Sequence, residues 1–472
     1  MSDRPSSLDE PLLRRLFEDA VERSGAFGAQ MSIIKAGEQV DFAAGFAHAA
    51  RGVAMTPNTL IQIGSITKLF NAMIILSLVE DHVLDLDVPI KAYIPSFEVA
   101  GPKACPSLTL RHLLSMSSGV DNGPYIYFGS GEDALSRYVK GLKSLPQHFS
   151  PGGHFGYSNA GICIAGHAAS MVTHKPWETL LWERILHPAR LSRAAILDDD
   201  LQDQVVSVGH DESAAGGKPK IIEPLFAALR ARAPSGPSFA TSAGNLARLA
   251  KIFINKGVSD TGVRILSAAS VELMMTPQID VPTRKYGHAW CIGPVTGNWN
   301  GVQVWGHGGT SATSTSFLYW MPKVEGVIAF AVNTHAAMGE FSKAAFNDIL
   351  KVAFGLSKPP IDLPERHLGS IDHRRYIGCY EELGVRMDVT PGDGDTLRAQ
   401  WTPKPGENEM AVGRIEQSAI LMPLGAERFL VIPSHGPDKH RGVVDMAFFG
   451  NDGCGRATNA INLLFPMSRV QN

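Results

Sequence analysis

The segment Gln62-Ile-Gly-Ser-Ile-Thr-Lys-Leu-Phe70 leads into the longest apolar run of the chain, residues 69–79. Ser65 and Lys68 stand at positions i and i+3, so a helix that begins here places both side chains on one face. A serine hydroxyl becomes a nucleophile when a base takes its proton, and a lysine whose pKa is lowered by burial can be that base. The positive end of the helix dipole also favours developing negative charge. The alternative is an N-cap serine with an exposed lysine one turn later.

A second cluster is Tyr157-Ser-Asn159, which follows the turn Phe149-Ser-Pro-Gly152. A phenol near a cationic lysine can be held partly ionised and relay protons, and an amide can orient the lysine or a substrate carbonyl. The alternative is a loop whose asparagine caps a helix over 160–172. Residues 156–161 depart from G-x-S-x-G by one position, so they do not indicate a nucleophile elbow at Ser158.

The third cluster is Trp305-Gly-His-Gly-Gly-Thr310. Paired glycines on a strand, here Gly308 and Gly309, let a substrate backbone approach closely. His307 is a candidate hydrogen-bond donor or carboxylate contact. The backbone N–H groups of Thr310 and Ser65 are candidate halves of an oxyanion hole. The alternative is a bend at a sheet corner that carries a surface histidine.

The order of helical and extended patterns predicts an α+β fold. The predicted elements are a helix at 8–25, strands at 29–34 and 40–46, a helix from Ser65, further helical segments between 108 and 187, a helix at 241–256, four short strands within 285–335 and a helix at 338–354. The four strands with glycine-rich turns are typical of an antiparallel meander, and the last of them is apolar enough to be central.

A proline-rich passage at 356–366 marks a boundary. The residues beyond it look all-β, with six predicted strands at near-regular spacing, which favours a small barrel or sandwich. The sequence therefore predicts a first domain at 1–355, a linker at 356–366 and a C-terminal β-barrel-like domain at 367–472.

Composition excludes several function classes. Lys and Arg total 43 and Asp and Glu total 46, a net charge of −3 that lacks the basic surface of a nucleic-acid binder. The N-terminus lacks the apolar core of a secretory signal, and no apolar run reaches the roughly 20 residues that span a bilayer. Five widely spaced cysteines without a C-x-x-C pair predict free thiols in a reducing compartment. We expect a cytoplasmic protein without a nucleic-acid or membrane partner.

Taken together, S-x-x-K, Y-x-N and H-x-G in this order resemble the penicillin-recognising serine hydrolases. These include class C β-lactamases, D-Ala-D-Ala carboxypeptidases, D-aminopeptidases and family VIII esterases. Residues 108–119 and 149–161 also resemble characteristic segments of these enzymes, and the likeness covers about residues 10–355. It implies a β-lactamase-like fold, with a helical domain beside an antiparallel sheet flanked by helices and the site between them.

The resemblance also implies an acyl-enzyme route. Ser65 attacks a carbonyl, Lys68 and Tyr157 share the proton transfers, and no metal or organic cofactor takes part. The groups implied to bind the substrate and the oxyanion are Asn159, His307, Gly309 and Thr310. Which of Lys68 and Tyr157 is the principal base stays open.

Two departures bear on the substrate. Many lactam-recognising members carry Lys-Thr/Ser-Gly where this chain has His307-Gly-Gly309, and their ammonium contacts the substrate carboxylate. The histidine resembles D-aminopeptidase-like members and argues against efficient β-lactam hydrolysis. Tyr376-Ile-Gly-Cys-Tyr380 resembles the opening of the lipocalin-like barrels of such relatives, in which a barrel loop can limit substrate length. The alternative is a passive stability or dimerisation module.

We therefore predict a serine hydrolase that cleaves peptide or amide bonds of small peptides or D-amino-acid derivatives. The alternatives are a carboxylesterase of the same fold, an acyltransferase, and a binding protein that kept the fold. The sequence leaves open the exact substrate, its stereochemistry and a homo-oligomeric state.

Overall fold

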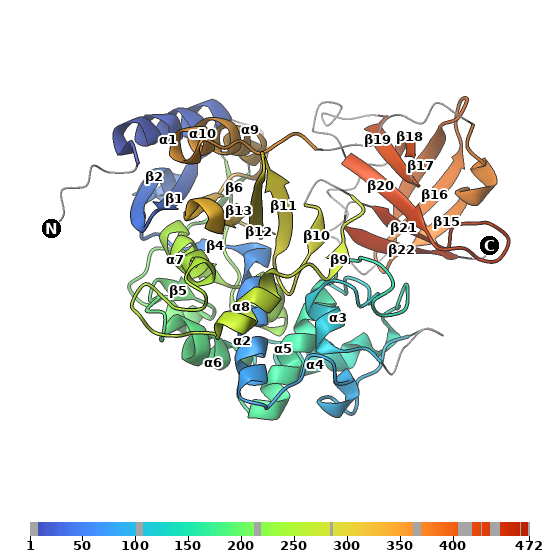
Figure 1. Cartoon of the computed structure of the whole chain (residues 1–472), viewed down its shortest axis with the longest axis horizontal. Coiled ribbons are helices and arrows are strands. Elements are labelled where there is room, and N and C mark those ends of the chain that lie inside the picture. The colour runs from blue at the N-terminus through green and yellow to red at the C-terminus, as the bar shows by residue number, and fades with distance from the viewer. Residues whose placement is uncertain are drawn as a thin grey trace.

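The structure, a computed structural model, describes residues 8–100, 107–211, 219–283, 287–361, 370–404, 418–425, 427–434, 444–462 and 464–470. The predicted linker at 356–366 lies only partly within these ranges, and the predicted boundary at 367 lies outside them. Figure 1 shows a layered part, which contains the chain from α1 (Glu10–Ser24) to α10 (Leu350–Phe354), and a barrel formed by the C-terminal strands.

A nine-stranded antiparallel sheet is the centre of the layered part. From one edge to the other its strands are β3 (Val53–Ala54), β2 (Glu38–His48), β1 (Gly28–Lys35), β14 (Gly326–Val332), β13 (Thr315–Met321), β12 (Val302–Thr310), β11 (Val295–Trp299), β10 (Ala289–Trp290) and β9 (Ile279–Asp280). Strand β1 pairs with β14, so the N-terminal hairpin joins the predicted meander. All of β14 is buried, which confirms its predicted central place.

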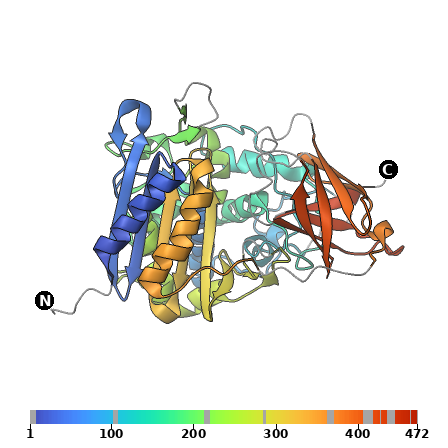
Figure 2. The same ribbon diagram turned by 90° about the horizontal axis from the view of Figure 1, so that it is seen from above.

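The two faces of the sheet pack against different layers, because successive side chains of a strand point to opposite faces. Leu318 and Trp320 pack toward the larger helical layer, whereas Tyr319 and Met321 pack toward the other face. That other face is covered by α1 (Glu10–Ser24), α9 (Met338–Ala344) and α10 (Leu350–Phe354), which lie in front of the sheet in Figure 2.

The larger helical layer is built around α2 (Thr67–Glu80). All residues of α2 from Thr67 to Leu78 are buried, as expected for a helix that is mostly apolar all round. The other helices of the layer are α3 (Leu110–Leu114), α4 (Ala134–Gly141), α5 (Asn159–Thr173), α6 (Trp177–Leu181), α7 (Ala243–Ile254) and α8 (Ala268–Met275). Two small sheets complete it: β4 (Ile61–Gln62), β8 (Ala240–Thr241) and β5 (Ala194–Ala195), and the pair β6 (Gly209–Asp211) and β7 (Lys220–Ile222).

The C-terminal strands form a closed antiparallel barrel. They are β15 (Gly378–Glu381), β16 (Val385–Pro391), β17 (Leu397–Pro403), β18 (Ser418–Gly425), β19 (Arg428–Pro433), β20 (Val444–Phe449), β21 (Asn459–Asn462) and β22 (Phe465–Val470), and β22 pairs with β15 to close it. The sequence predicted six strands and missed the last two, β21 and β22. Strand β21 is short and β22 contains Pro466, a residue that weakens a strand pattern in the sequence.

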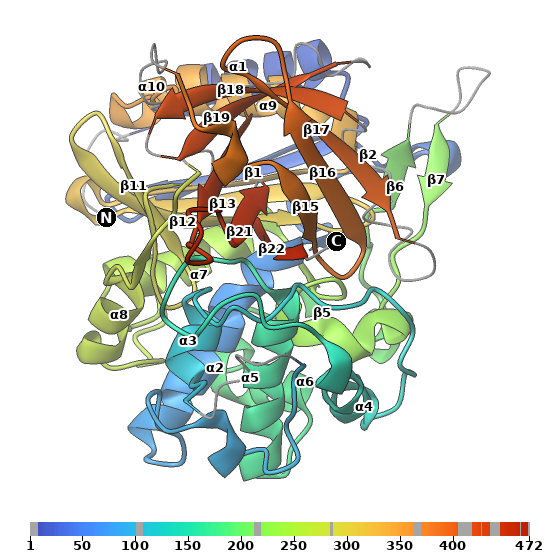
Figure 3. The same cartoon turned by 90° about the vertical axis from the view of Figure 1, so that its right-hand side faces the viewer.

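The barrel is packed against the helical layer. Ile461 and Leu464, from the β21–β22 hairpin, belong to the same buried apolar cluster as the residues of α2 and α5. Figure 3 views the molecule from the barrel side, with β21 and β22 in front of the layered part, and Figure 1 shows the same two strands on the side of the barrel nearer to β9. The hairpin is therefore part of the main core as well as of the barrel.

Two further expectations can be compared with the described residues. Within the described ranges, no helix is long and apolar enough to cross a membrane. Four cysteines are free thiols, as predicted, namely Cys163, Cys291, Cys379 and Cys454, and Cys105 lies outside the described residues.

Candidate active site

Ser65 lies in a tight 3-10 turn, Gly64–Ile66, that leads into α2. The prediction started the helix at Ser65, but the α-helix itself begins at Thr67. The turn is fixed by two side-chain hydroxyls: Thr67 Oγ1 donates to the Gly64 carbonyl at 2.7 Å and Ser316 Oγ, from β13, donates to the Ile63 carbonyl at 2.9 Å. The sheet therefore holds the turn that carries the candidate nucleophile.

Lys68 is completely buried, which rules out the alternative of an exposed lysine. Its Nζ lies 2.9 Å from Ser65 Oγ and donates to the Ser235 carbonyl at 2.6 Å. Burial holds the pKa of Lys68 well below its ordinary value; the nearby Cys163 acts in the opposite direction, and the Arg232 guanidinium adds a smaller lowering. A lowered pKa favours the neutral amine, which is the form that can accept a proton from serine.

Tyr157 is buried beside this pair. Its ring centroid lies 5.0 Å from Lys68 Nζ. Trp290 packs edge-on against the tyrosine ring at 5.6 Å, and Phe465 of the barrel does the same at 5.9 Å. The backbone N–H of Tyr157 donates to the Leu464 carbonyl at 2.9 Å. The barrel hairpin therefore contacts a predicted catalytic residue directly.

Asn159 is the first residue of α5, but it does not cap the helix. The cap is Ser158, whose hydroxyl oxygen accepts from the Gly161 N–H at 2.9 Å. The Asn159 amide donates to Asn122 Oδ1 and to the Tyr125 hydroxyl, both at 2.9 Å. Its described bonds therefore join the Tyr157 segment to the loop after α3.

His307 lies on the face of β12 that looks toward the helical layer, and it is buried, so the surface-histidine alternative is wrong. The Trp290 ring lies 5.3 Å away and the Tyr157 ring 6.4 Å away. Its Nδ1 donates to the Gly308 carbonyl at 2.5 Å, since a carbonyl can only accept. Burial, with the nearby Lys68, lowers the pKa of His307 to about 3, so the imidazole is neutral at neutral pH.

The end of β12 lies against the nucleophile turn. A Cβ built on Gly309 would stand 1.8 Å from the Ile63 carbonyl oxygen, and a Cβ on Gly64 would stand 2.4 Å from the Thr310 nitrogen. Both positions therefore need glycine for close backbone approach. This contact brings the backbone of Thr310 next to that of the Ser65 turn, where the predicted oxyanion groups are required.

Sequence reasoning did not single out Arg232 and Ser235, which precede a glycine turn and lie beside Lys68. The Arg232 guanidinium stacks over the Tyr125 ring, 3.5 Å from its centroid. Trp290 also packs against two predicted site residues, Tyr157 and His307. No periodicity marks these residues, because Arg232 and Ser235 come from the segment Ala227–Ser235 and Trp290 comes from β10, both far along the chain from Ser65 and Tyr157.

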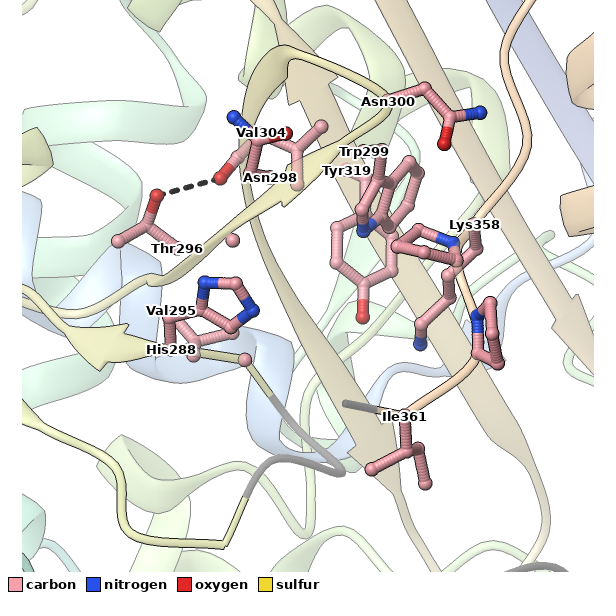
Figure 4. Close-up of a pocket in the computed structure, with 14 residues that line it drawn as sticks. His288, Val295, Thr296, Asn298, Trp299, Asn300, Val304, Tyr319, Lys358 and Ile361 are labelled. Carbon is pink, nitrogen blue, oxygen red and sulfur yellow. Dashed lines mark hydrogen bonds between the residues drawn. The ribbon is translucent and has the colours of Figure 1, made fainter. Parts of the chain in front are cut away.

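A cavity of about 350 Å³ lies away from these residues, between the sheet and the segment that follows α10 (Figure 4). It is lined by Val304, Trp299 and Tyr319, which belong to the core beneath α1 and α9 rather than to the His307 face. No group of three or more His, Cys, Asp or Glu side chains in the described ranges is arranged to hold a metal ion. The cavity therefore plays no part in the site around Ser65.

Comparison with known proteins agrees with this geometry. Residues 13–353 match the protein family described as Beta-lactamase. The chain belongs to that family. Penicillin-binding protein 4 of Amycolatopsis lactamdurans is 28% identical over 364 residues, which cover 76% of this chain and 93% of that protein. The chain is thus a serine hydrolase of the penicillin-recognising superfamily, as the three motifs predicted.

Solved structures with low identity show the same fold. SurE has a TM-score of 0.77 at 21% identity and covers 97% of this chain and 98% of its own chain. The D-amino acid amidase from Ochrobactrum anthropi SV3, complexed with L-phenylalanine amide, has a TM-score of 0.59 at 20% identity and covers 73% of this chain and 97% of its own. The predicted β-lactamase-like fold with a C-terminal barrel is confirmed.

Proposed function

We propose that this enzyme hydrolyses amide or peptide bonds of small peptides or D-amino-acid derivatives through an acyl-enzyme on Ser65. The observation that carries the proposal is the 2.9 Å separation of Lys68 Nζ from Ser65 Oγ, with the lysine fully buried. Burial favours the neutral amine, whose lone pair can take the hydroxyl proton. The D-amino acid amidase among the structural neighbours supports the substrate class.

In the first step Ser65 Oγ attacks the substrate carbonyl carbon and the hydroxyl proton passes to Lys68. The oxyanion accepts hydrogen bonds from the backbone N–H groups of Ser65 and Thr310, which cost no reorganisation as charge develops. The proton then passes to the leaving amine, with Tyr157 beside Lys68 as the second group of the relay. Attack by water on the acyl-enzyme, assisted by the same groups, releases the acid and restores Ser65.

The neutral His307 bears on the substrate. With a pKa lowered to about 3 it carries no positive charge at neutral pH, so it offers no ion pair to a substrate carboxylate. β-Lactam antibiotics carry such a carboxylate. We therefore expect weak β-lactam turnover and better turnover of neutral amides.

A single-plate comparison tests the proposal. The plate holds D- and L-aminoacyl p-nitroanilides, short linear peptides, a short-chain p-nitrophenyl ester and a chromogenic cephalosporin, with Ser65→Ala as the blank. Ser77→Ala is a matched control on the same helix, since its hydroxyl donates to the Ile74 carbonyl within α2. Amide or peptide turnover above the blank supports the proposal.

The other outcomes favour the alternatives. Ester turnover alone would favour a carboxylesterase of this fold, and product transfer to an added amine would favour an acyltransferase. Undiminished turnover in Ser65→Ala would exclude the proposed mechanism.

A further inference from the structure

Buried contacts between the barrel and the helical layer converge on one group, which we call the Asp121 node: Asp121, His148, Leu383 and Ser468. His148 Nε2 donates to Asp121 Oδ2 at 2.9 Å, and His148 Nδ1 lies 2.9 Å from Ser468 Oγ in β22. The Leu383 N–H, between β15 and β16, donates to the same carboxylate oxygen at 3.0 Å. The Asp121 carboxylate therefore accepts hydrogen bonds from the layered part, through His148, and from the barrel, through Leu383.

The node is not a second catalytic triad, although Ser468, His148 and Asp121 stand in that order. The His148 and Asp121 side chains are only 1% and 2% exposed, so a substrate has no access to them. Buried charge-assisted hydrogen bonds of this kind fix geometry, because losing one partner leaves the other unsatisfied. The Asp121 node therefore has a structural role.

The backbone of the node leads directly to the tyrosine motif. The Asp121 carbonyl accepts from Ser158 Oγ at 2.8 Å, and Ser158 is also the cap of α5. The next residue, Asn122, accepts through Oδ1 from the backbone N–H and the side-chain amide of Asn159, at 3.0 and 2.9 Å. Two consecutive residues therefore hold the two residues that follow Tyr157.

The barrel holds Tyr157 itself from the other side. The Leu464 carbonyl accepts from the Tyr157 N–H, and the Phe465 ring packs against the phenol ring. Asn459, in β21, donates to the His148 carbonyl at 3.1 Å, so the same hairpin also contacts the node. Tyr157 thus depends on the barrel both directly and through the segment at 121–122.

We propose that Asp121 and His148 are positioning residues, which dock the barrel and thereby hold Tyr157 in place against Lys68 and Ser65. The proposal rests on the proposed function in taking these three as the reacting groups. It makes the barrel a working part of the active site rather than a passive stability module. A misplacement of about 1 Å at a reacting group can cost roughly 100-fold in rate, so loosening the node should lower turnover.

The test uses the full-length protein and three variants. His148→Phe keeps a ring but removes both hydrogen bonds, and His148→Gln retains a donor that can reach Asp121. Asp445→Asn is the matched control, since Asp445 is a buried carboxylate whose pair with Arg428 joins two neighbouring barrel strands, β20 and β19. Each variant is measured for the rate of Ser65 labelling by a fluorophosphonate probe, for thermal stability, and for hydrogen–deuterium exchange in a peptide covering residues 154–162.

We expect His148→Phe to label at least roughly tenfold more slowly and to exchange faster over residues 154–162, with His148→Gln in between. Asp445→Asn should lose stability but keep the labelling rate and the exchange of that peptide. Wild-type exchange over residues 154–162 in His148→Phe would overturn the proposal, as would equal loss of labelling in Asp445→Asn. A wild-type protein that is not labelled at Ser65 would instead count against the proposed function, and the exchange measurement would still decide the node.

Discussion

Replacing Gly309 by alanine is a direct test of how β12 and the nucleophile turn fit together. The added Cβ would stand 1.8 Å from the Ile63 carbonyl oxygen and 2.9 Å from Ser316 Oγ. The carbonyl is backbone, so no rotamer change relieves the contact. Reaching 3.0 Å, the shortest separation that real Cβ atoms tolerate, requires a movement of 3.0 − 1.8 = 1.2 Å.

That movement changes the position of the reacting groups, because Ile63 lies two residues before Ser65. Either the turn moves away from Lys68, or Thr310 moves away from the turn. A displacement of about 1 Å can lower the rate roughly 100-fold, which corresponds to about 2.7 kcal/mol in the activation free energy. Overpacking a well-packed site also costs about 1–3 kcal/mol of stability, so the protein should fold but with a lower Tm.

Gly308→Ala is the matched control on the same strand. Its Cβ would meet the Phe317 ring at 2.9 Å, and an aromatic side chain can turn by the small amount required. The assay is kcat/KM on the best substrate from the plate, with Tm measured on the same samples. We expect a large loss in Gly309→Ala and near wild-type activity in Gly308→Ala. Full activity in a folded Gly309→Ala would refute the claim that this contact sets the site.

Three further predictions concern buried ionisable groups. Because burial lowers the pKa of Lys68, the unfolded chain binds more protons than the folded chain between that lowered pKa and about 10.4, so stability rises with pH there. Lys68→Met should be inactive, and its free energy of unfolding should lose this rise with pH. Urea unfolding at about pH 7 and pH 9 measures the rise, and a variant with the same rise as the wild type would contradict the prediction. His307, with a pKa lowered to about 3, should show no titration between about pH 5 and 8 in histidine-selective NMR, and a titration in that window would contradict the neutral imidazole. Asp445→Asn breaks the buried pair with Arg428 and should cost about 3–5 kcal/mol in the free energy of unfolding, whereas an unchanged urea midpoint would show that the pair adds nothing.

Much of the fold could be predicted because local patterns agree with it. The apolar run after Ser65 became the buried helix α2, and the run at 326–332 became a central strand. Pairing of β1 with β14 could not be predicted from periodicity, since it joins segments about three hundred residues apart. Strand β22 was missed because Pro466 interrupts its pattern.

The candidate site likewise has residues that the sequence predicted and features that it did not. Ser65, Lys68, Tyr157 and His307 carry motif spacing, and the structure brings them together. The burial that lowers the lysine pKa depends on tertiary packing, which spacing alone does not reveal. Phe465 and the Asp121 node come from the barrel interface, where no local sequence signal indicates a role near Tyr157.

Intact-protein mass spectrometry of the enzyme mixed with a D-aminoacyl p-nitrophenyl ester and quenched during turnover tests the central claim most directly. The account predicts a mass gain equal to the acyl group, located by digestion to the peptide that contains Ser65 and absent in Ser65→Ala. An acyl group on another residue, or turnover that persists in Ser65→Ala, would contradict it.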